Sequence, residues 1–261
     1  MPAISPERLK RDVAHLLSQL GDLDAFKRSL DQLFEFYADR TIRPSRAGLP
    51  ASLLPSHHVP RPVLRKLEYG LAEFAGADPE AALSLAGRLW ASGIFQEMLL
   101  AVRLVGTLPA GQNGPAVELL MEWSRGTKDE SVLEEVFQIA AKKDVKAVLA
   151  VLEERLELKR TAQDGALAGL VYLARHAGED SLPGIYKLYS RALDRPIREQ
   201  QAGMLALTRE LAERSPAETA YFLRQNLLTA RRPDLARLLR QCLPLFPEDI
   251  QAGLKAMLRG N

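Results

Sequence analysis

The sequence lacks several features that would assign it to a common functional class. Its single cysteine, Cys242, allows no internal disulfide, and residues 1–13 contain no apolar segment of a secretion signal. We therefore expect a protein of the reducing cytoplasm. No apolar run approaches the ~18 residues that span a bilayer. Neither GxxxxGK[ST] nor GxGxxG follows a strand-like segment, so the usual signatures of nucleotide hydrolysis and dinucleotide redox chemistry are missing.

Histidine is also scarce. The sequence has 4 histidines, and no two of them form an i, i+4 pair on a plausible helix. Without cysteine partners, they lack the spacing of a metal site. The adjacent His57 and His58 belong to the Pro- and Ser-rich stretch 49–60, for which we expect an exposed loop. The sequence therefore predicts no metal and no cofactor.

The chain carries almost no net charge. Its 35 Lys and Arg residues nearly balance its 33 Asp and Glu residues, for a formal charge of +2. That total is too small for the whole chain to bind polyanions without local segregation of charge. The charge is uneven, since residues 61–190 hold 15 basic and 18 acidic side chains and residues 191–261 hold 12 and 8. Any nucleic-acid surface must come from this local excess.

Helical periodicity is abundant in the sequence. Apolar residues recur at i, i+3, i+4 and i+7 in almost every segment, and no convincing alternating run is bounded by turn residues. We predict an all-α protein with about fourteen helices. Their expected ranges are 6–20, 23–38, 60–75, 79–91, 93–107, 114–125, 129–142, 144–158, 162–177, 182–192, 195–213, 216–228, 233–243 and 248–259.

Local signals mark the ends of these helices. Proline at the first helical position costs nothing, because its missing N–H would have had no partner there. Such starts occur at Ser5-Pro6, Asp78-Pro79, Ser215-Pro216 and Arg232-Pro233. Glycine favours the left-handed conformation that often ends a helix. We predict such ends near Gly21, Gly76, Gly93, Gly126 and Gly178.

The helices form a repeating arrangement. After residue 76 the connections are short, so consecutive helices form antiparallel hairpins, which recur about every 30–40 residues, as in HEAT or armadillo solenoids. The exception is the Pro-rich stretch 40–59, which favours a flexible tether over a ligand-contacting loop. The expected organisation is a helical pair at 1–39, a linker at 40–59 and a HEAT-like α-α superhelix at 60–261.

Two segments carry a family resemblance. Residues 87–101 consist of Leu-Trp, a short turn, a Glu and an apolar helix, and Val59-Pro60 with residues 64–67 precede them. This order resembles the AlkD-like DNA alkylation repair proteins, a family of HEAT-like superhelices that includes alkylpurine DNA glycosylases. The resemblance implies binding of duplex DNA in a basic concave groove and excision of alkylated purines with the help of a carboxylate. Taken without the family, Trp90 is a core residue.

The family's catalytic segment corresponds to residues 126–134. Its pattern is aromatic-Asp-Ser-Val-Asp, and Ser131-Val132 match it, with Glu130 at the first acidic position. Leu133 occupies the position of the second, catalytic acid and supplies no charge for a cationic transition state. If the register differs by one residue, Glu134 is the surviving acid. The resemblance thus makes Glu130 and Glu134 the candidate catalytic residues and leaves open whether the chain is an enzyme.

Basic residues recur near the ends and second helices of the predicted hairpins. In a solenoid, such residues line the concave surface and contact a phosphate backbone with little sequence preference. The candidate DNA-binding residues are Lys142, Lys143, Lys146, Lys159, Arg160, Arg195, Arg198, Arg231 and Arg232. The competing interpretation is that these side chains cover solvated helix faces and pair with Glu at i, i+4.

A non-catalytic protein-interaction scaffold is the alternative function, because HEAT-like arrays often bind proteins. Its groove would combine mixed charge with exposed aromatic side chains. The aromatic candidates are Tyr186, Tyr189 and Tyr221-Phe222, although tyrosine at this spacing also packs half-buried between helices.

Overall fold

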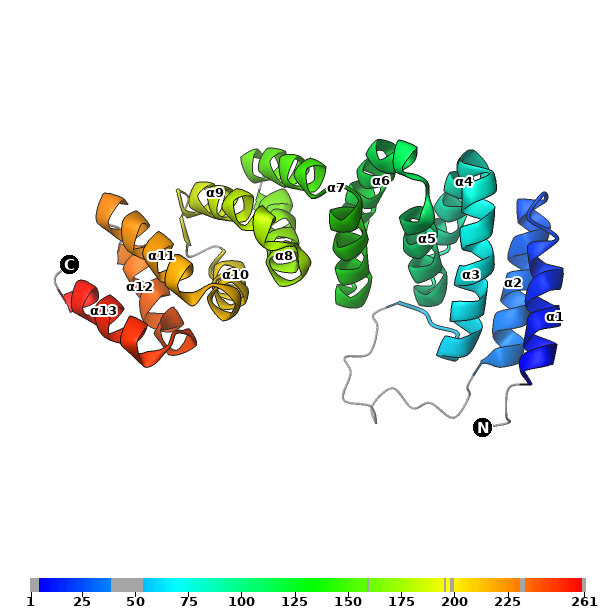
Figure 1. The fold of residues 1–261 in the computed structure, drawn as a ribbon, viewed down its shortest axis with the longest axis horizontal. Coiled ribbons are helices and arrows are strands. Elements are labelled where there is room, and N and C mark those ends of the chain that lie inside the picture. Colours follow the sequence, from blue (N-terminus) through cyan, green and yellow to red (C-terminus); the bar gives the residue numbers. More distant parts are fainter. Residues whose placement is uncertain are drawn as a thin grey trace. The chain divides into compact units, whose positions relative to one another are not determined.

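The chain folds into α-helices in the computed structural model, which describes residues 5–38, 54–158, 160–194, 196–197, 200–230 and 233–259. No strand occurs in these residues, and the predicted all-α helical-repeat fold class is confirmed. The described helices are α1 (Pro6–Leu17), α2 (Leu23–Tyr37), α3 (Arg61–Ala77), α4 (Pro79–Ala91), α5 (Phe95–Thr107), α6 (Asn113–Gly126), α7 (Glu130–Glu157), α8 (Arg160–His176), α9 (Leu182–Leu193), α10 (Gln201–Arg214), α11 (Pro216–Ala230), α12 (Pro233–Cys242) and α13 (Glu248–Arg259) (Figure 1).

The chain divides into two compact units, Met1–Lys143 and Asp144–Asn261. In the first unit α1 packs on α3, α3 packs on α5, and α4 contacts both α3 and α5. The predicted amino-terminal helix pair therefore belongs to the same compact unit as the first repeats. Of the predicted linker, residues 40–53 lie outside the described residues, and residues 54–60, here called the strap, lead into α3.

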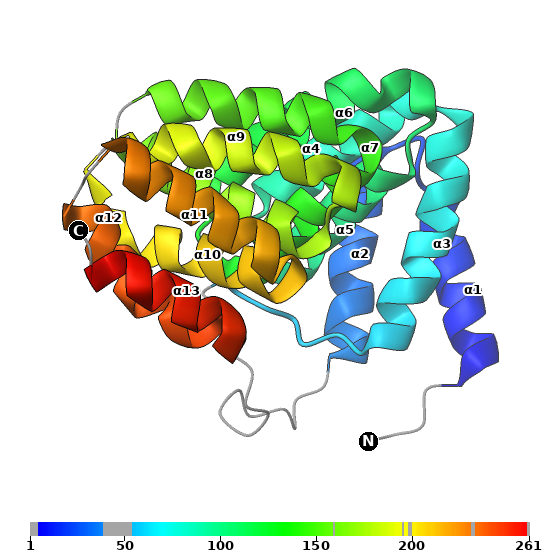
Figure 2. The same cartoon turned by 60° about the vertical axis from the view of Figure 1, so that its left-hand side comes forward.

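The helices of the second unit form two layers. α10 contacts α8 and α12 in one layer, and α11 contacts α13 in the other. Tyr186 and Tyr189 of α9 pack against Phe222 of α11, and Figure 2 shows α9 and α11 side by side. Each helix thus stacks on the helix two places along the chain, as expected for a helical repeat.

Aspartate side chains cap several helix starts. Asp22 accepts hydrogen bonds from the first amides of α2, and Asp78 accepts one from Ala81 of α4 at 3.0 Å. Both residues satisfy backbone N–H groups that have no partner within the helix. The predicted proline starts are confirmed, since α1, α4, α11 and α12 begin at Pro6, Pro79, Pro216 and Pro233.

α7 is two helices joined at Asp144. This residue has non-helical backbone angles of φ −160° and ψ 94°. Its side chain accepts hydrogen bonds at 3.0 Å from the amides of Lys146 and Ala147, so Asp144 is the N-cap of the second half. This agrees with the prediction of separate helices at 129–142 and 144–158.

The predicted left-handed glycine ends are correct only at Gly93. Gly93 follows α4 with a φ of 67°, and no other described glycine has a positive φ. At Gly76 the prediction is wrong because α3 continues to Ala77, and at Gly126 it is wrong because that residue is still helical. Gly21 and Gly178 also lack the positive φ.

The buried residues are mostly leucine and alanine, with a few large aromatic side chains. Phe26, Phe34, Phe137 and Tyr189 are among the largest fully buried side chains of the described residues. Phe26 and Phe34 come from the apolar face of α2, which therefore buries large side chains within the first unit. None of the described helices is both long and apolar enough to cross a membrane.

Candidate functional site

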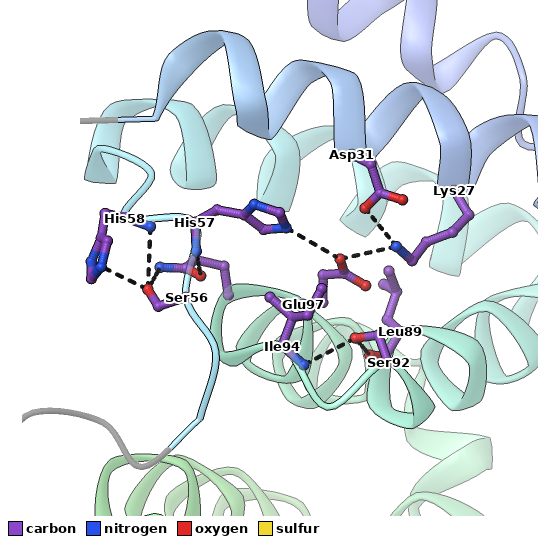
Figure 3. Close-up of polar contacts among 10 residues, drawn as sticks. Lys27, Asp31, Ser56, His57, His58, Leu89, Ser92, Ile94 and Glu97 are labelled. Atoms are coloured by element: carbon purple, nitrogen blue, oxygen red, sulfur yellow. Dashed lines mark hydrogen bonds and ion pairs between the residues drawn. The ribbon is translucent and has the colours of Figure 1, made fainter. Parts of the chain in front are cut away.

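Four ionisable side chains meet in the first unit, and we call them the charged cluster. Lys27 and Asp31 come from α2, His57 from the strap and Glu97 from the first turn of α5 (Figure 3). The Lys27 Nζ donates hydrogen bonds to Asp31 Oδ1 at 2.6 Å and to Glu97 Oε1 at 3.1 Å. One ammonium group therefore joins two carboxylates from different helices.

Glu97 is the most deeply buried member of the charged cluster. Its side chain is 0% exposed, and its Oε2 atom has no hydrogen-bond partner. Burial raises the pKa of the Glu97 carboxyl above its ordinary value of 4.5, although the nearby Ser92 hydroxyl and Lys27 ammonium act in the opposite direction. The site therefore disfavours the charged carboxylate while holding a cation beside it.

Lys27 remains charged in this position. Burial by itself lowers the pKa of Lys27, but the hydrogen bonds to Asp31 and Glu97 outweigh it and leave the pKa above its ordinary value. Its side chain is 28% exposed. The ammonium group thus reaches inward to the carboxylates while part of its stem stays at the surface.

His57 is held in place by the strap and α5. Its backbone N–H donates to Gln96 Oε1 at 3.0 Å, and the Phe95 N–H donates to the Pro55 carbonyl at 2.9 Å. The imidazole ring packs on Phe34, with 5.5 Å between centroids, and its Nε2 lies 4.0 Å from Glu97 Oε1. This Nε2 is buried and has no hydrogen-bond partner. The arrangement aims the imidazole at the Glu97 carboxylate.

The expectation of an exposed loop at His57 and His58 is wrong. Both residues are only partly exposed, and Phe34 of α2 and Gln96 of α5 contact His57. His58 turns away from the charged cluster, and its Nδ1 lies 3.4 Å from Ser56 Oγ. The composition of this stretch predicts a loop, which is correct for its backbone, but carries no information on what packs over it.

The sequence-predicted catalytic residues lie elsewhere in the first unit. Glu130 is exposed at the first position of α7, and Glu134 is partly buried one turn later. The preceding Asp129 is buried and caps the helix, accepting a hydrogen bond from the Val132 N–H at 3.2 Å. Leu133 is partly buried. Neither Glu130 nor Glu134 belongs to the charged cluster.

The two tryptophans pair with each other. The indole rings of Trp90 in α4 and Trp123 in α6 stack with centroids 4.5 Å apart and planes 3° apart. Trp123 is buried and Trp90 is partly exposed. Both rings therefore contribute to helix packing, as expected for Trp90 when the family resemblance is set aside.

The predicted DNA-binding residues fall into three groups. Lys142 and Lys146 are exposed and form no ion pair with a described residue. Lys143 turns inward, since its Nζ donates to the Leu108 carbonyl at 2.8 Å, and burial lowers the pKa of its ammonium group. The rest lie outside the described residues, namely Lys159, Arg195, Arg198, Arg231, Arg232 and the side chain of Arg160.

A junction of α12 with the start of α10 and the segment before it was not foreseen from the sequence. The Ile197 N–H donates to Asp234 Oδ2 at 3.3 Å, and Gln201 Nε2 donates to Gln241 Oε1 at 2.6 Å. Arg237 helps to line a small hollow there, of about 70 Å³. Arg237 and Arg240 are exposed on α12 and form no ion pair with a described residue.

Comparison with known proteins gives no family assignment. No model of a protein family matches the chain, and no curated protein matches its sequence. The likeness to the AlkD-like proteins therefore rests on the residues named above.

Proposed function

We propose that this chain is a helical-repeat protein that binds duplex DNA through basic side chains on its helices. The observation that supports this best is the Ile197–Asp234 hydrogen bond, which joins two chain segments that are distant in sequence. The sequence has Arg195 and Arg198 on either side of Ile197, and Arg231-Arg232 just before α12. Among the described residues, the exposed Arg237 of α12 lines the hollow at this junction.

Each of the two units also has exposed basic side chains. Arg237 and Arg240 on α12, and Lys142 and Lys146 in α7, have no acidic partner among the described residues and are available to phosphate groups. Each phosphate contact releases counterions, so binding would weaken steeply with salt and depend little on sequence. Lys143 is not among the proposed DNA contacts, because its ammonium group donates a hydrogen bond to the Leu108 carbonyl.

If base excision occurs, Glu130 or Glu134 would have to supply the carboxylate that the family resemblance implies, since Leu133 cannot. Replacing each glutamate by alanine and measuring the release of alkylated purines from DNA tests this activity. We place the protein in the reducing cytoplasm, where its single cysteine, Cys242, which is buried in α12, stays a thiol.

Fluorescence anisotropy with a labelled duplex tests DNA binding. We expect binding at micromolar protein in low salt, and we expect Arg237→Gln/Arg240→Gln to weaken it and to reduce the salt slope by about two. Lys10→Gln/Arg11→Gln is the matched control, because it removes the same charge from exposed positions of α1. No binding by the unaltered protein in low salt, or equal losses in both variants, would contradict the proposal.

A protein-interaction scaffold is the second candidate function, and one observation favours it. Tyr221 and Leu228 are 64% and 58% exposed, and their spacing of seven residues places them on one stripe of α11. Of the other aromatic candidates, Tyr189 is fully buried, whereas Tyr186 and Phe222 are partly exposed and pack on each other. The Tyr186 hydroxyl lies 2.8 Å from Thr219 Oγ1. Absence of salt-dependent DNA binding would favour this function over the first.

A further inference from the structure

Three elements of the first unit bring metal-ligating atoms together. Asp31 of α2, His57 of the strap and Glu97 of α5 each offer one such atom, and the three atoms lie within 4.8 Å of one another (Figure 3). We propose that these side chains form a binding site for a divalent first-row transition metal ion, with Zn²⁺ as the best match. The site is independent of the proposed DNA binding.

Two atoms of this site lack the partners that buried polar atoms normally have. Glu97 Oε2 and His57 Nε2 are both buried without a hydrogen bond, and the Glu97 side chain is 0% exposed. Leaving a buried polar atom without a partner costs free energy, so such atoms call for an explanation. A metal ion between the imidazole and the carboxylate would satisfy both atoms at once.

The charges of the cluster also match a divalent cation. Asp31 and Glu97 supply two carboxylates, and at present the Lys27 ammonium is the cation between them. A doubly charged ion would neutralise both carboxylates and release Lys27, whose flexible stem is already 28% exposed. Lys27 is therefore a competitor of the metal within the protein itself.

The types of ligand atom select the class of ion. Zinc accepts imidazole and carboxylate ligands, and three protein ligands leave a fourth position for water. Imidazole disfavours Mg²⁺ and Ca²⁺, and among divalent first-row ions other than copper zinc binds such ligands strongly. The 4.0 Å between His57 Nε2 and Glu97 Oε1 is close to the ~3.4 Å between two ligands of a tetrahedral zinc. Asp31, 39% exposed, has room to adjust.

A metal site at these residues was not expected from the sequence. The expectation of no metal rested on the absence of histidine pairs at helical spacing and of cysteine partners. In the structure each ligand comes from a different element, and only one of them is a histidine. No spacing along the sequence marks such a site.

The experiment is a calorimetric titration of the chelator-treated, full-length protein with Zn²⁺. We expect one Zn²⁺ per chain, and we expect His57→Asn to weaken binding by at least about tenfold. His58→Asn is the matched control, since the neighbouring histidine points to Ser56 and asparagine tolerates the left-handed backbone at this position, where φ is 52°. Lys27→Met should bind Zn²⁺ more tightly than the unaltered protein, because it removes the competing cation.

Three outcomes would overturn the site. They are no stoichiometric binding to the unaltered protein, equal Zn²⁺ affinity in His57→Asn and His58→Asn, and unchanged or weaker affinity in Lys27→Met. Circular dichroism of each metal-free variant checks its fold. If His57→Asn does not fold, Asp31→Asn takes its place, because that side chain is partly exposed and its loss should also weaken binding.

Discussion

At the scale of single residues, the Lys27–Glu97 ion pair joins a partly exposed ammonium group to a fully buried carboxylate. An ion pair with one buried partner adds little to the free energy of unfolding. The cost of removing the charges from water is about as large as the gain from their attraction. Removing one partner is much more costly, since it leaves the other charge without compensation. We therefore expect the pair to specify the contact between α2 and α5 more than it adds to stability.

Glu97 should make the stability of the protein depend on pH. Its pKa in the folded state lies above the ordinary 4.5. As pH rises above 4.5, Glu97 loses its proton in the unfolded chain at a lower pH than it does in the folded protein. The folded state then binds more protons, so the free energy of unfolding falls through this interval and stays lower above it. We expect Glu97→Gln to remove this decrease in the free energy of unfolding.

Urea unfolding between about pH 4 and pH 8 measures the effect. Glu80→Gln is the matched control, because Glu80 is an exposed glutamate on α4. A Glu97→Gln protein whose stability falls over this interval as steeply as that of the unaltered protein would show that another group causes the dependence.

At the scale of helices, local signals were sufficient wherever the structure depends on neighbours in sequence. Aspartate and proline gave correct starts because a capping side chain and the amides it satisfies lie within three residues. Apolar periodicity gave the helix order, since one buried stripe is enough to form a packed layer. Glycine was a poorer guide, because Gly76 and Gly126 lie within helices that could equally have ended there.

The charged cluster could not be predicted in this way. Its contacts join α2, the strap and α5, and the sequence shows only a lysine and an aspartate at helical spacing, a histidine pair and one glutamate in an apolar helix. Glu97 was the available signal, because it occupies a position of α5 that faces the core together with Ala101 and Leu104. A charged residue on an apolar face indicates a buried partner without identifying it.

Replacing either of two glycines in or next to α4 by alanine should change the free energy of unfolding, with opposite signs for the two positions. Gly93 has a left-handed backbone, which costs about 1 kcal/mol for a residue with a Cβ atom. Gly87 is inside α4, where alanine is a better helix former by about 1 kcal/mol. Neither Cβ would meet an atom within 4 Å, so packing does not mask either effect. We expect Gly93→Ala to destabilise and Gly87→Ala to stabilise the first unit.

Thermal or urea unfolding of both variants measures the two effects. Each glycine serves as the control for the other, since the substitution is the same. Stabilisation by Gly93→Ala would contradict the left-handed conformation.

At the scale of the whole molecule, the two compact units should unfold separately. Both tryptophans, Trp90 and Trp123, belong to the first unit, so tryptophan fluorescence reports on that unit alone. Far-ultraviolet circular dichroism reports on helices of both units. We expect the urea transitions followed by these two probes not to coincide, which is the usual sign that unfolding is not a two-state process.

Variants in each unit sharpen this test. Gly93→Ala should shift the fluorescence transition to lower urea. Thr208→Ala removes a fully buried hydroxyl that forms a hydrogen bond with Tyr189 in the second unit, at a cost of about 1–3 kcal/mol. It should shift only the urea transition followed by circular dichroism. Coincident transitions that both variants shift alike would mean that the chain unfolds as one body.

The pairing of Lys27 with Glu97 also constrains how this sequence can change through evolution. Because losing one charge costs more than replacing both, a lineage that loses the lysine should soon lose the glutamate, or the reverse. Positions 27 and 97 are therefore expected to covary among descendants of a common ancestor, although 70 residues separate them in the chain. Exposed lysines such as Lys10 should vary without such a partner.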